Sequence, residues 1–198
     1  MPRGIWGMRY FTLVCLFFSG CQLVELDKGK FYRSPQPSRK DLERAITFLK
    51  IKTVINLRGA NPGEIWYDEE KAVTDFRGVK LIDIPMSAGR LPHRKDLLAL
   101  LDAYQTAERP ILVHCQAGVD RTGEASAIYA MLYLGISKDL ALEMLTPQFG
   151  YIEEISAARA KMYFIRDLWQ GEEWARTQYD PCKQNYRYYD KNNYAECK

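Results

Sequence analysis

The stretch Ile111-Leu-Val-His-Cys-Gln-Ala-Gly-Val-Asp-Arg-Thr-Gly123 decides the fold of this chain. The run from Ile111 to His114 has the composition of a buried strand, and a helix pattern begins near Thr122. In α/β proteins a ligand binds where such a strand ends and the next helix begins. The N–H groups of the intervening loop and the helix N-terminus together form a nest for an anion. The stretch therefore predicts an α/β fold with an anion site directly after this strand.

Two side chains of this stretch have the chemistry for moving a phosphoryl group onto sulfur. The loop dipoles favour the thiolate form of Cys115, which would act as the nucleophile. The alternative is a buried free cysteine without a chemical role. Arg121 keeps its proton and can bind two phosphate oxygens at once, and Thr122 would donate its hydroxyl to the sulfur or cap the helix. The residues expected around the phosphate are Gln116, Ala117, Gly118, Val119, Asp120 and Arg121.

The pattern His-Cys-x5-Arg-Thr resembles the signature of the protein tyrosine phosphatase superfamily. Phe31–Ser38, Thr53–Arg58 and Ile82–Met86 resemble further segments of small atypical dual-specificity phosphatases, most of all the exported bacterial type. The resemblance covers about residues 30–170. It implies a central, mostly parallel sheet of four to five strands flanked by helices. It also implies hydrolysis of a phosphomonoester, on a phosphotyrosine protein or a small molecule, through a phosphocysteine and without a metal or other cofactor.

The chain departs from this family where the reaction needs a general acid. The resemblance places an Asp in the loop after the strand Val79–Ile84, and the aligned residue here is Gly89. Asp120 is one possible substitute, and its alternative role is to brace the loop through the backbone or Arg58. Asp83 is a weaker alternative acid, and the favoured interpretation is a surface or hydrogen-bonded strand residue. Because a phenolate leaves with less help than an alkyl alcohol, a weak acid favours aryl phosphates.

The remaining residues of the expected site have supporting roles. The resemblance implies that His114 braces Cys115 and its loop, and that Arg58 supports the loop from the neighbouring strand. Two other functions stay open, a phosphoinositide or inositol phosphate phosphatase and a phosphate-binding pseudophosphatase. The loop contains no Lys, which argues against inositol polyphosphates because their charge rewards additional cations.

Residues 1–20 have the pattern of a bacterial signal peptide. Arg3 and Arg9 precede an apolar core, Tyr10–Phe18, which is too short for a stable membrane anchor. Small residues and then Cys21 follow, which resembles a lipobox and predicts that Cys21 is lipidated. We therefore expect a lipoprotein on the periplasmic side of a bacterial membrane, with the outer membrane favoured. The alternative is a soluble periplasmic or secreted protein.

The rest of the chain is expected to hold one domain. We predict a tether at 21–30, a phosphatase domain at 31–178 and a Tyr-rich tail at 179–198. In an oxidising compartment Cys182 and Cys197 can form a disulfide, and the alternative is two free thiols. The formal net charge of +3 gives no case for nucleic-acid binding.

Strand and helix patterns alternate along the domain, as in a mostly parallel sheet covered on both faces. In the helix at 64–77 we expect Ile65, Ala72, Val73 and Phe76 to face the core. Strands are predicted at 31–33, at the sheet edge, and at 53–57, 79–84 and 111–114; helices are predicted at 38–50, 64–77, from Pro92 onward, 122–134, 137–146 and 153–169.

Overall fold

The computed structural model describes residues 12–13, 23–150 and 159–183 of the 198-residue chain. Its strands form one sheet in the order β1-β2-β3-β6-β4-β5. Neighbouring strands from β3 to β5 pair in parallel, whereas β1 and β2 are antiparallel additions at one edge. The strands are β1 (Thr12–Leu13), β2 (Val24–Asp27), β3 (Phe31–Ser34), β4 (Thr53–Asn56), β5 (Lys80–Asp83) and β6 (Ile111–His114).

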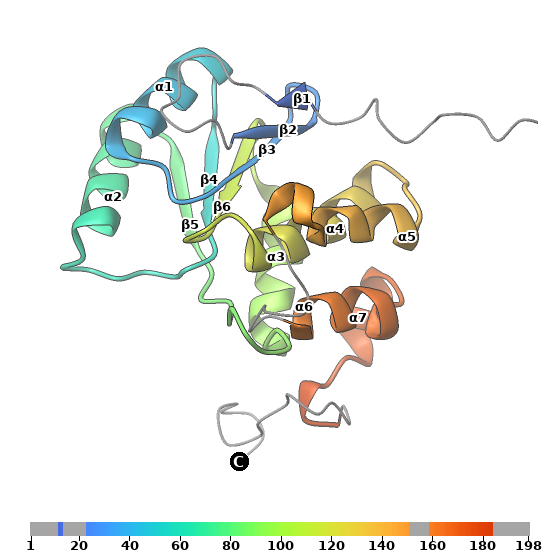
Figure 1. The fold of residues 1–198 in the computed structure, drawn as a ribbon. Helices are drawn as coiled ribbons and strands as arrows, with labels where there is room; N and C mark the ends of the chain where they lie inside the picture. Colours follow the sequence, from blue (N-terminus) through green and yellow to red (C-terminus); the bar gives the residue numbers. More distant parts are fainter. Residues whose placement is uncertain (1–11, 14–22, 151–158, 184–198) are drawn as a thin grey trace, which may run out of the picture.

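Helices cover both faces of this sheet (Figure 1), which confirms the predicted α/β class. The helices α1 (Arg39–Leu49) and α2 (Ile65–Arg77) lie on one face, and α3 (Arg94–Thr106) and α4 (Asp120–Tyr133) lie on the other. The shorter helical segments are α5 (Lys138–Ala141), η1 (Leu142–Leu145), η2 (Pro147–Phe149), α6 (Arg159–Tyr163), η3 (Phe164–Leu168), α7 (Glu172–Thr177) and η4 (Pro181–Lys183).

Each face of the sheet has its own hydrophobic core. Successive side chains of a strand point to opposite faces, so in β4 Val54 enters one core and Ile55 the other. The smaller core lies under α1 and α2 and contains Leu42 and Val73. The larger core lies under α3 and α4 and contains Leu97, one of the residues expected on the core face of α3.

Residues 23–30 belong to the sheet and do not form the predicted tether. Strand β2 pairs antiparallel with β3, and Leu23 and Leu26 are buried in the two cores. Strand β3 is consequently internal, between β2 and β6, and the prediction of an edge strand at 31–33 was wrong.

Strand β2 was not predicted from the sequence because it contains charged residues. Glu25 and Asp27 alternate with apolar residues, as in a short polar tether. In the structure each carboxylate accepts a hydrogen bond from a tyrosine: Tyr32 donates to Glu25 Oε1 at 2.8 Å and Tyr129 donates to Asp27 Oδ2 at 2.9 Å. Because these partners come from other elements, no local pattern reveals them.

Helix α2 has the predicted position but presents a different face to the sheet. Ile65 and Phe76, expected in the core, are 77% and 85% exposed. The buried side chains are Tyr67, Glu70, Val73 and Thr74, of which only Val73 was expected. The helix rotates in this way because its polar residues have buried partners in the sheet, described below.

The C-terminal boundary of the domain also differs from the prediction. Tyr179, expected to begin the tail, is 1% exposed and packs against Phe164 and Trp174. Its hydroxyl donates to Pro92 O at 2.8 Å. Tyr179 therefore belongs to the larger core. Cys182 is disulfide-bonded, but its predicted pairing with Cys197 stays a prediction, because residues 184–198 lie outside the described part of the chain.

The predicted C-terminal helices are shorter and less regular than expected. The helix expected at 137–146 divides into α5 and the 3₁₀ segment η1. Within the helix expected at 153–169, residues 151–158 lie outside the described part, and 159–168 form α6 and the π-helical η3. Lys161 of α6 forms a fully buried ion pair with Glu124 of α4 at 2.8 Å, which ties these helices together.

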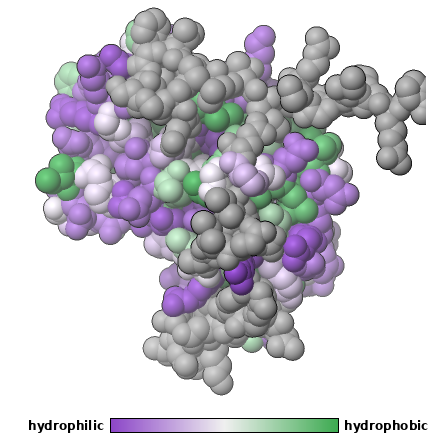
Figure 2. Space-filling model, in the orientation of Figure 1, coloured by the Kyte–Doolittle hydropathy of each residue, from purple (hydrophilic) through white to green (hydrophobic). Residues whose placement is uncertain are grey.

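The predicted signal peptide and Cys21 lie almost wholly outside the described residues. Only Thr12–Leu13 are described there, as the short strand β1 paired with β2. Within the described part of the chain, no helix has the length and apolar character needed to cross a membrane. Figure 2 shows a mostly hydrophilic surface over α1 and α2 in this view.

Candidate active site

The nucleophile loop, residues 115–119, connects the end of β6 to the start of α4. Cys115 is a free cysteine with 2% of its surface exposed. Helix α4 begins at Asp120, two residues before the predicted start at Thr122, so Asp120 and Arg121 belong to its first turn. The loop N–H groups therefore lead directly into the helix N-terminus, as an anion nest requires.

Gly118 allows the nucleophile loop to touch the β3–α1 connection. Its φ is +72°, and a Cβ placed there would lie 2.5 Å from Pro35 N. The two segments are also joined by a hydrogen bond from Gln36 N to Gln116 O at 3.1 Å. This geometry requires glycine at position 118. A Cβ at Gly123 would lie 2.6 Å from Leu145 of η1, so α4 and η1 also approach closely there.

The residues of the loop differ in their solvent exposure. Gln116 and Ala117 are exposed, Gly118 is buried and Val119 is half-buried. A phosphate held here would therefore contact these residues mainly through their backbone N–H groups. This is the arrangement that the sequence predicted.

Arg121 has donors that fit an anion. Its Nη1 donates to Leu57 O at 3.3 Å, which joins the first turn of α4 to the end of β4. Its Nε is buried and has no hydrogen-bond partner among the described residues. A guanidinium donates through all its N–H groups, so a phosphate oxygen would satisfy this one.

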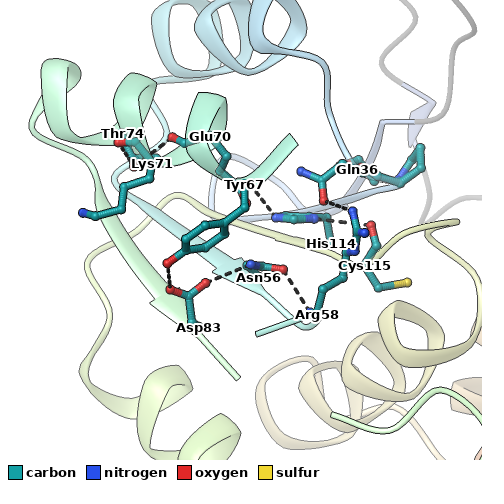
Figure 3. A network of polar contacts seen from close by, with 12 residues as sticks. Gln36, Asn56, Arg58, Tyr67, Glu70, Lys71, Thr74, Asp83, His114 and Cys115 are labelled. Carbon is teal, nitrogen blue, oxygen red and sulfur yellow. Dashed lines mark hydrogen bonds and ion pairs between the residues drawn. The ribbon is translucent and has the colours of Figure 1, made fainter. Parts of the chain in front are cut away.

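His114 connects the nucleophile loop to α2. Its Nε2 lies 2.7 Å from Glu70 Oε1, and both side chains are fully buried or nearly so. Its Nδ1 lies 3.4 Å from Cys115 O (Figure 3). The ring is fixed from both sides, as a brace requires. Glu70 was missed in the sequence because the apolar residues of α2 indicated a different buried face.

Arg58 extends into the site from the end of β4. Its guanidinium lies 3.3 Å from the centroid of the Trp66 ring and donates to Gln36 Oε1 at 2.9 Å. Burial and the like charge of Arg121 lower the pKa of Arg58, and Cys115 opposes this. The guanidinium group of Arg58 is therefore close enough to Arg121 and Cys115 to interact with the charges of both, which is compatible with the supporting role predicted for Arg58. Gln36 and Trp66 had no signal in the sequence that marked them as site residues.

The contacts of Asp83 favour a structural role over that of the general acid. Its Oδ2 accepts from Tyr67 at 2.7 Å and its Oδ1 accepts from Asn56 Nδ2 at 2.8 Å. Burial and then this hydrogen bond raise the pKa of Tyr67 to about 12, so the tyrosine remains the donor. Figure 3 shows Asn56 between Asp83 and Cys115. Asp83 is therefore the hydrogen-bonded strand residue of the other interpretation.

Asp120 is the carboxylate that the structure leaves next to the nucleophile loop. It is half-buried in the first turn of α4, one turn before Glu124. Burial raises the pKa of Glu124; Lys161 opposes this, and Asp120 adds to it. Residues 84–93, which connect β5 to α3 and include Gly89, contain no Asp or Glu. This connection therefore contains no carboxylate that could replace the general acid missing at Gly89.

Thr122 differs from both predicted roles. Its hydroxyl is buried and has no hydrogen-bond partner among the described residues. It does not cap α4, because the helix already begins at Asp120 and its N-cap residue is Val119.

The fold and this loop together are those expected of the cysteine-dependent phosphatase class, and comparison with known families agrees. The family described as "DSP-PTPase phosphatase fused to NAD+ Kinase" matches residues 19–156, more than half of the chain. The chain therefore belongs to this family, and the resemblance to atypical dual-specificity phosphatases is confirmed.

Individual relatives are more distant. Dual specificity protein phosphatase TpbA of Pseudomonas aeruginosa strain UCBPP-PA14 is 30% identical over 132 residues, 65% of this chain and 56% of that protein. The chain thus spans about half the length of the curated relatives it matches. The crystal structure of P. aeruginosa TpbA in complex with pTyr has a TM-score of 0.60 and 26% identity, covering 78% of this chain and 88% of that chain.

The same fold occurs in a yeast enzyme. The catalytic domain of the S. cerevisiae PP-IP phosphatase SIW14, solved in complex with citrate, has a TM-score of 0.62 at 22% identity. The match covers 78% of this chain and 88% of that chain. At this identity the likeness shows the shared fold alone.

Proposed function

We propose that this protein is a cysteine-dependent phosphomonoesterase that hydrolyses phosphotyrosine or other aryl phosphates. The observation that carries the proposal is that Cys115 and Arg121 lie at the two ends of one loop, and that Arg121 Nε is buried with no partner in the described part of the chain. The pTyr complex of TpbA supports the choice of substrate.

In the first step the thiolate of Cys115 attacks phosphorus. The S–P bond forms as the ester P–O bond breaks, and the electron pair leaves with the alcohol oxygen, which takes a proton from the general acid. Arg121 and the loop N–H groups hold the three equatorial oxygens and match the charge that develops on them. The fixed ring of His114 keeps the end of β6, and with it the sulfur, in place.

In the second step water attacks the phosphocysteine. The S–P bond breaks, inorganic phosphate leaves and Cys115 returns to the thiolate. The proton of the attacking water needs an acceptor, and the general acid of the first step can take it. We assign this residue as Asp120, because both oxygens of Asp83 already accept hydrogen bonds.

A second candidate substrate class is supported by Arg58. Two guanidinium groups in one site favour a substrate with a second anionic group, as in inositol phosphates. The nucleophile loop itself contributes only one cation, Arg121, which favours the smaller charge of an aryl monoester.

The test is phosphate release by wild type and by Cys115→Ser on a panel of phosphotyrosine peptide, aryl phosphate, alkyl phosphate and inositol polyphosphate. We expect turnover of the aryl substrates that falls by at least about a thousandfold in the variant. Fast turnover of inositol polyphosphate with slow turnover of phosphotyrosine would replace the first substrate class by the second. Equal rates for wild type and variant would indicate a pseudophosphatase.

We also propose that the protein is a lipoprotein on the periplasmic side of the membrane, attached through Cys21. The support is the signal-peptide pattern of residues 1–20 and the Cys that follows it. Cys21→Ala should move the protein from the membrane fraction to the soluble fraction. Unchanged partitioning of this variant would leave the soluble periplasmic or secreted alternative.

A further inference from the structure

Arg33 is a buried cation without a carboxylate partner among the described residues. It lies on β3, with 2% of its surface exposed. Its Nη2 donates to Gly118 O at 2.8 Å and its Nη1 donates to Met144 O at 3.3 Å. The guanidinium lies 4.3 Å from the centroid of the Phe149 ring. Because burying an unpaired charge is costly, a guanidinium in this position needs a reason beyond packing.

Arg33 lies beside the strand that leads into the nucleophile, because it is in register with Val113 of β6, two residues before Cys115. Burial lowers the pKa of Arg33 to about 10, and the strongest opposing influence is the negative charge of Cys115, followed by Tyr104. The guanidinium therefore stays charged at neutral pH. Its other partners, two carbonyl oxygens and an aromatic ring, are neutral.

The contact with Gly118 also bears on the shape of the loop. In an anion nest the N–H groups converge on the ligand, so the carbonyl oxygens point outward and need donors elsewhere. Arg33 supplies that donor to Gly118 O from behind the loop. It also joins the loop to Met144 of η1, so one side chain fixes two segments.

We propose that Arg33 is a positioning residue of the nucleophile loop: it holds the Gly118 carbonyl away from the phosphate and supplies the buried positive charge that stabilises the thiolate of Cys115. The proposal deepens the proposed function and rests on it. Arg33 and Arg121 have different backbone partners, since Arg33 donates to Gly118 O and Arg121 to Leu57 O, so the role of Arg33 complements that of Arg121.

Other titratable groups lie on the elements around Cys115. Among the arginines, Arg33 differs from Arg58 and Arg121 in its nearly complete burial, which removes the screening by water that weakens exposed charges. The other groups are Arg58 at the end of β4, the pair of His114 and Glu70, Asp120 and Arg121 in α4, and Tyr104 in α3.

The experiment compares the full-length wild type with Arg33→Met and Arg33→Lys. The rate of alkylation of Cys115 by iodoacetamide is followed against pH by mass spectrometry of the peptide that contains it, and kcat and KM are measured on an aryl phosphate. Tyr32→Phe is the matched control, because Tyr32 is adjacent on β3 but points into the other core.

In Arg33→Met we expect the midpoint of the alkylation curve to rise by about one pH unit, which slows alkylation about tenfold at pH values below both midpoints. The plateau at high pH should not change. Arg33→Lys should keep the midpoint within a few tenths of wild type, but lower kcat, because one ammonium group cannot hold both carbonyls. Tyr32→Phe should match wild type in both measurements.

A folded Arg33→Met with the wild-type midpoint would overturn the charge role. Wild-type kcat and KM in Arg33→Lys would overturn the positioning role. If Arg33→Met does not fold, Arg33→Lys decides alone, and a raised midpoint in that charged variant overturns the charge role. Failure of the proposed function has a different signature, because wild type itself would then show the ordinary thiol midpoint of about 8.5 and no turnover.

Discussion

Glu70 illustrates how much of this site depends on a single buried contact. It is 2% exposed, and it is the partner that holds the Nε2 side of the His114 ring. Glu70→Ala leaves a buried ring nitrogen without a partner, which should lower the free energy of unfolding by about 1–3 kcal/mol. Glu70→Gln keeps an acceptor oxygen at the same place and should cost less. Urea denaturation measures both values.

The control for this prediction is Lys71→Ala on the same helix. Lys71 forms an exposed ion pair with Asp75 at 2.9 Å, and such pairs contribute little. Its loss should change the free energy of unfolding by no more than about 0.5 kcal/mol. If Glu70→Ala were no more destabilising than Lys71→Ala, the bracing role of Glu70 would be wrong.

A second prediction at the residue scale separates the two candidate acids. Asp120→Asn should lower kcat by about 10²-fold or more on an alkyl phosphate and by less on an aryl phosphate, because a phenolate needs less protonation. It should also abolish the basic limb of the pH–rate profile. Asp83→Asn should leave that limb in place, since Tyr67 and Asn56 already bond to its carboxylate. A basic limb that persists in Asp120→Asn and vanishes in Asp83→Asn would reverse the assignment.

Most of the site residues that the sequence predicted lie in one continuous stretch. Cys115, Gly118 and Arg121 are close in space because a strand, a loop and a helix start follow one another. Arg33 and Glu70 meet this stretch only through the tertiary fold. Neither has a periodicity or spacing that separates it from an ordinary charged residue, and the resemblance of Phe31–Ser38 to the family did not single out Arg33.

At the scale of elements, the contact between the nucleophile loop and the β3–α1 connection can be tested through Gly118. Gly118→Ala introduces a Cβ at a positive φ and 2.5 Å from backbone that cannot move aside. We expect a loss in unfolding free energy that exceeds the strain of about 1–2 kcal/mol for the left-handed conformation alone. Phosphatase activity should fall as well, because the displaced loop is the phosphate site.

Gly135→Ala is the control for Gly118→Ala. Gly135 has a similar φ of +64°, but nothing lies within 4 Å of the Cβ that would be added. This variant therefore measures backbone strain without the collision, and its activity should remain. Equal losses of stability in the two variants, measured by urea denaturation, would show that the close approach of Pro35 contributes nothing.

Strands and helices were predictable wherever their hydrophobic pattern agreed with their tertiary contacts. Strand β6 has the predicted bounds, and α1 begins after Ser38 as expected, because the Ser38 side chain accepts from Asp41 N at 3.2 Å. Strand β2 and the buried face of α2 were not predictable, because polar side chains there are buried against distant partners. In both places tyrosine–carboxylate hydrogen bonds replace the apolar contacts that a pattern can detect.

For the molecule as a whole, the strand order explains how distant segments form one site. Strand β6 lies between β3 and β4, and all three run in parallel. Their carboxyl ends meet at one edge, where the connections after them bring Gln36, Arg58 and Cys115 together (Figure 3). The parallel direction of these three strands follows from the alternation of strands and helices. The position of the added strand β2 does not follow from this pattern, although β2 makes β3 internal and so helps to bury Arg33.

The last prediction concerns where the domain ends. The sequence placed the boundary at residue 178, whereas the structure packs Tyr179 into the larger core and bonds its hydroxyl to Pro92. Tyr179→Ala should lower the free energy of unfolding by about 3–5 kcal/mol because it opens a cavity. Tyr179→Phe should lose only the hydrogen bond, about 1 kcal/mol. Phe76→Ala is the control, since Phe76 is 85% exposed, and should stay within about 0.5 kcal/mol of wild type. A Tyr179→Ala variant as stable as this control would restore the boundary at 178, and a large loss would place the segment after α7 within the folded domain.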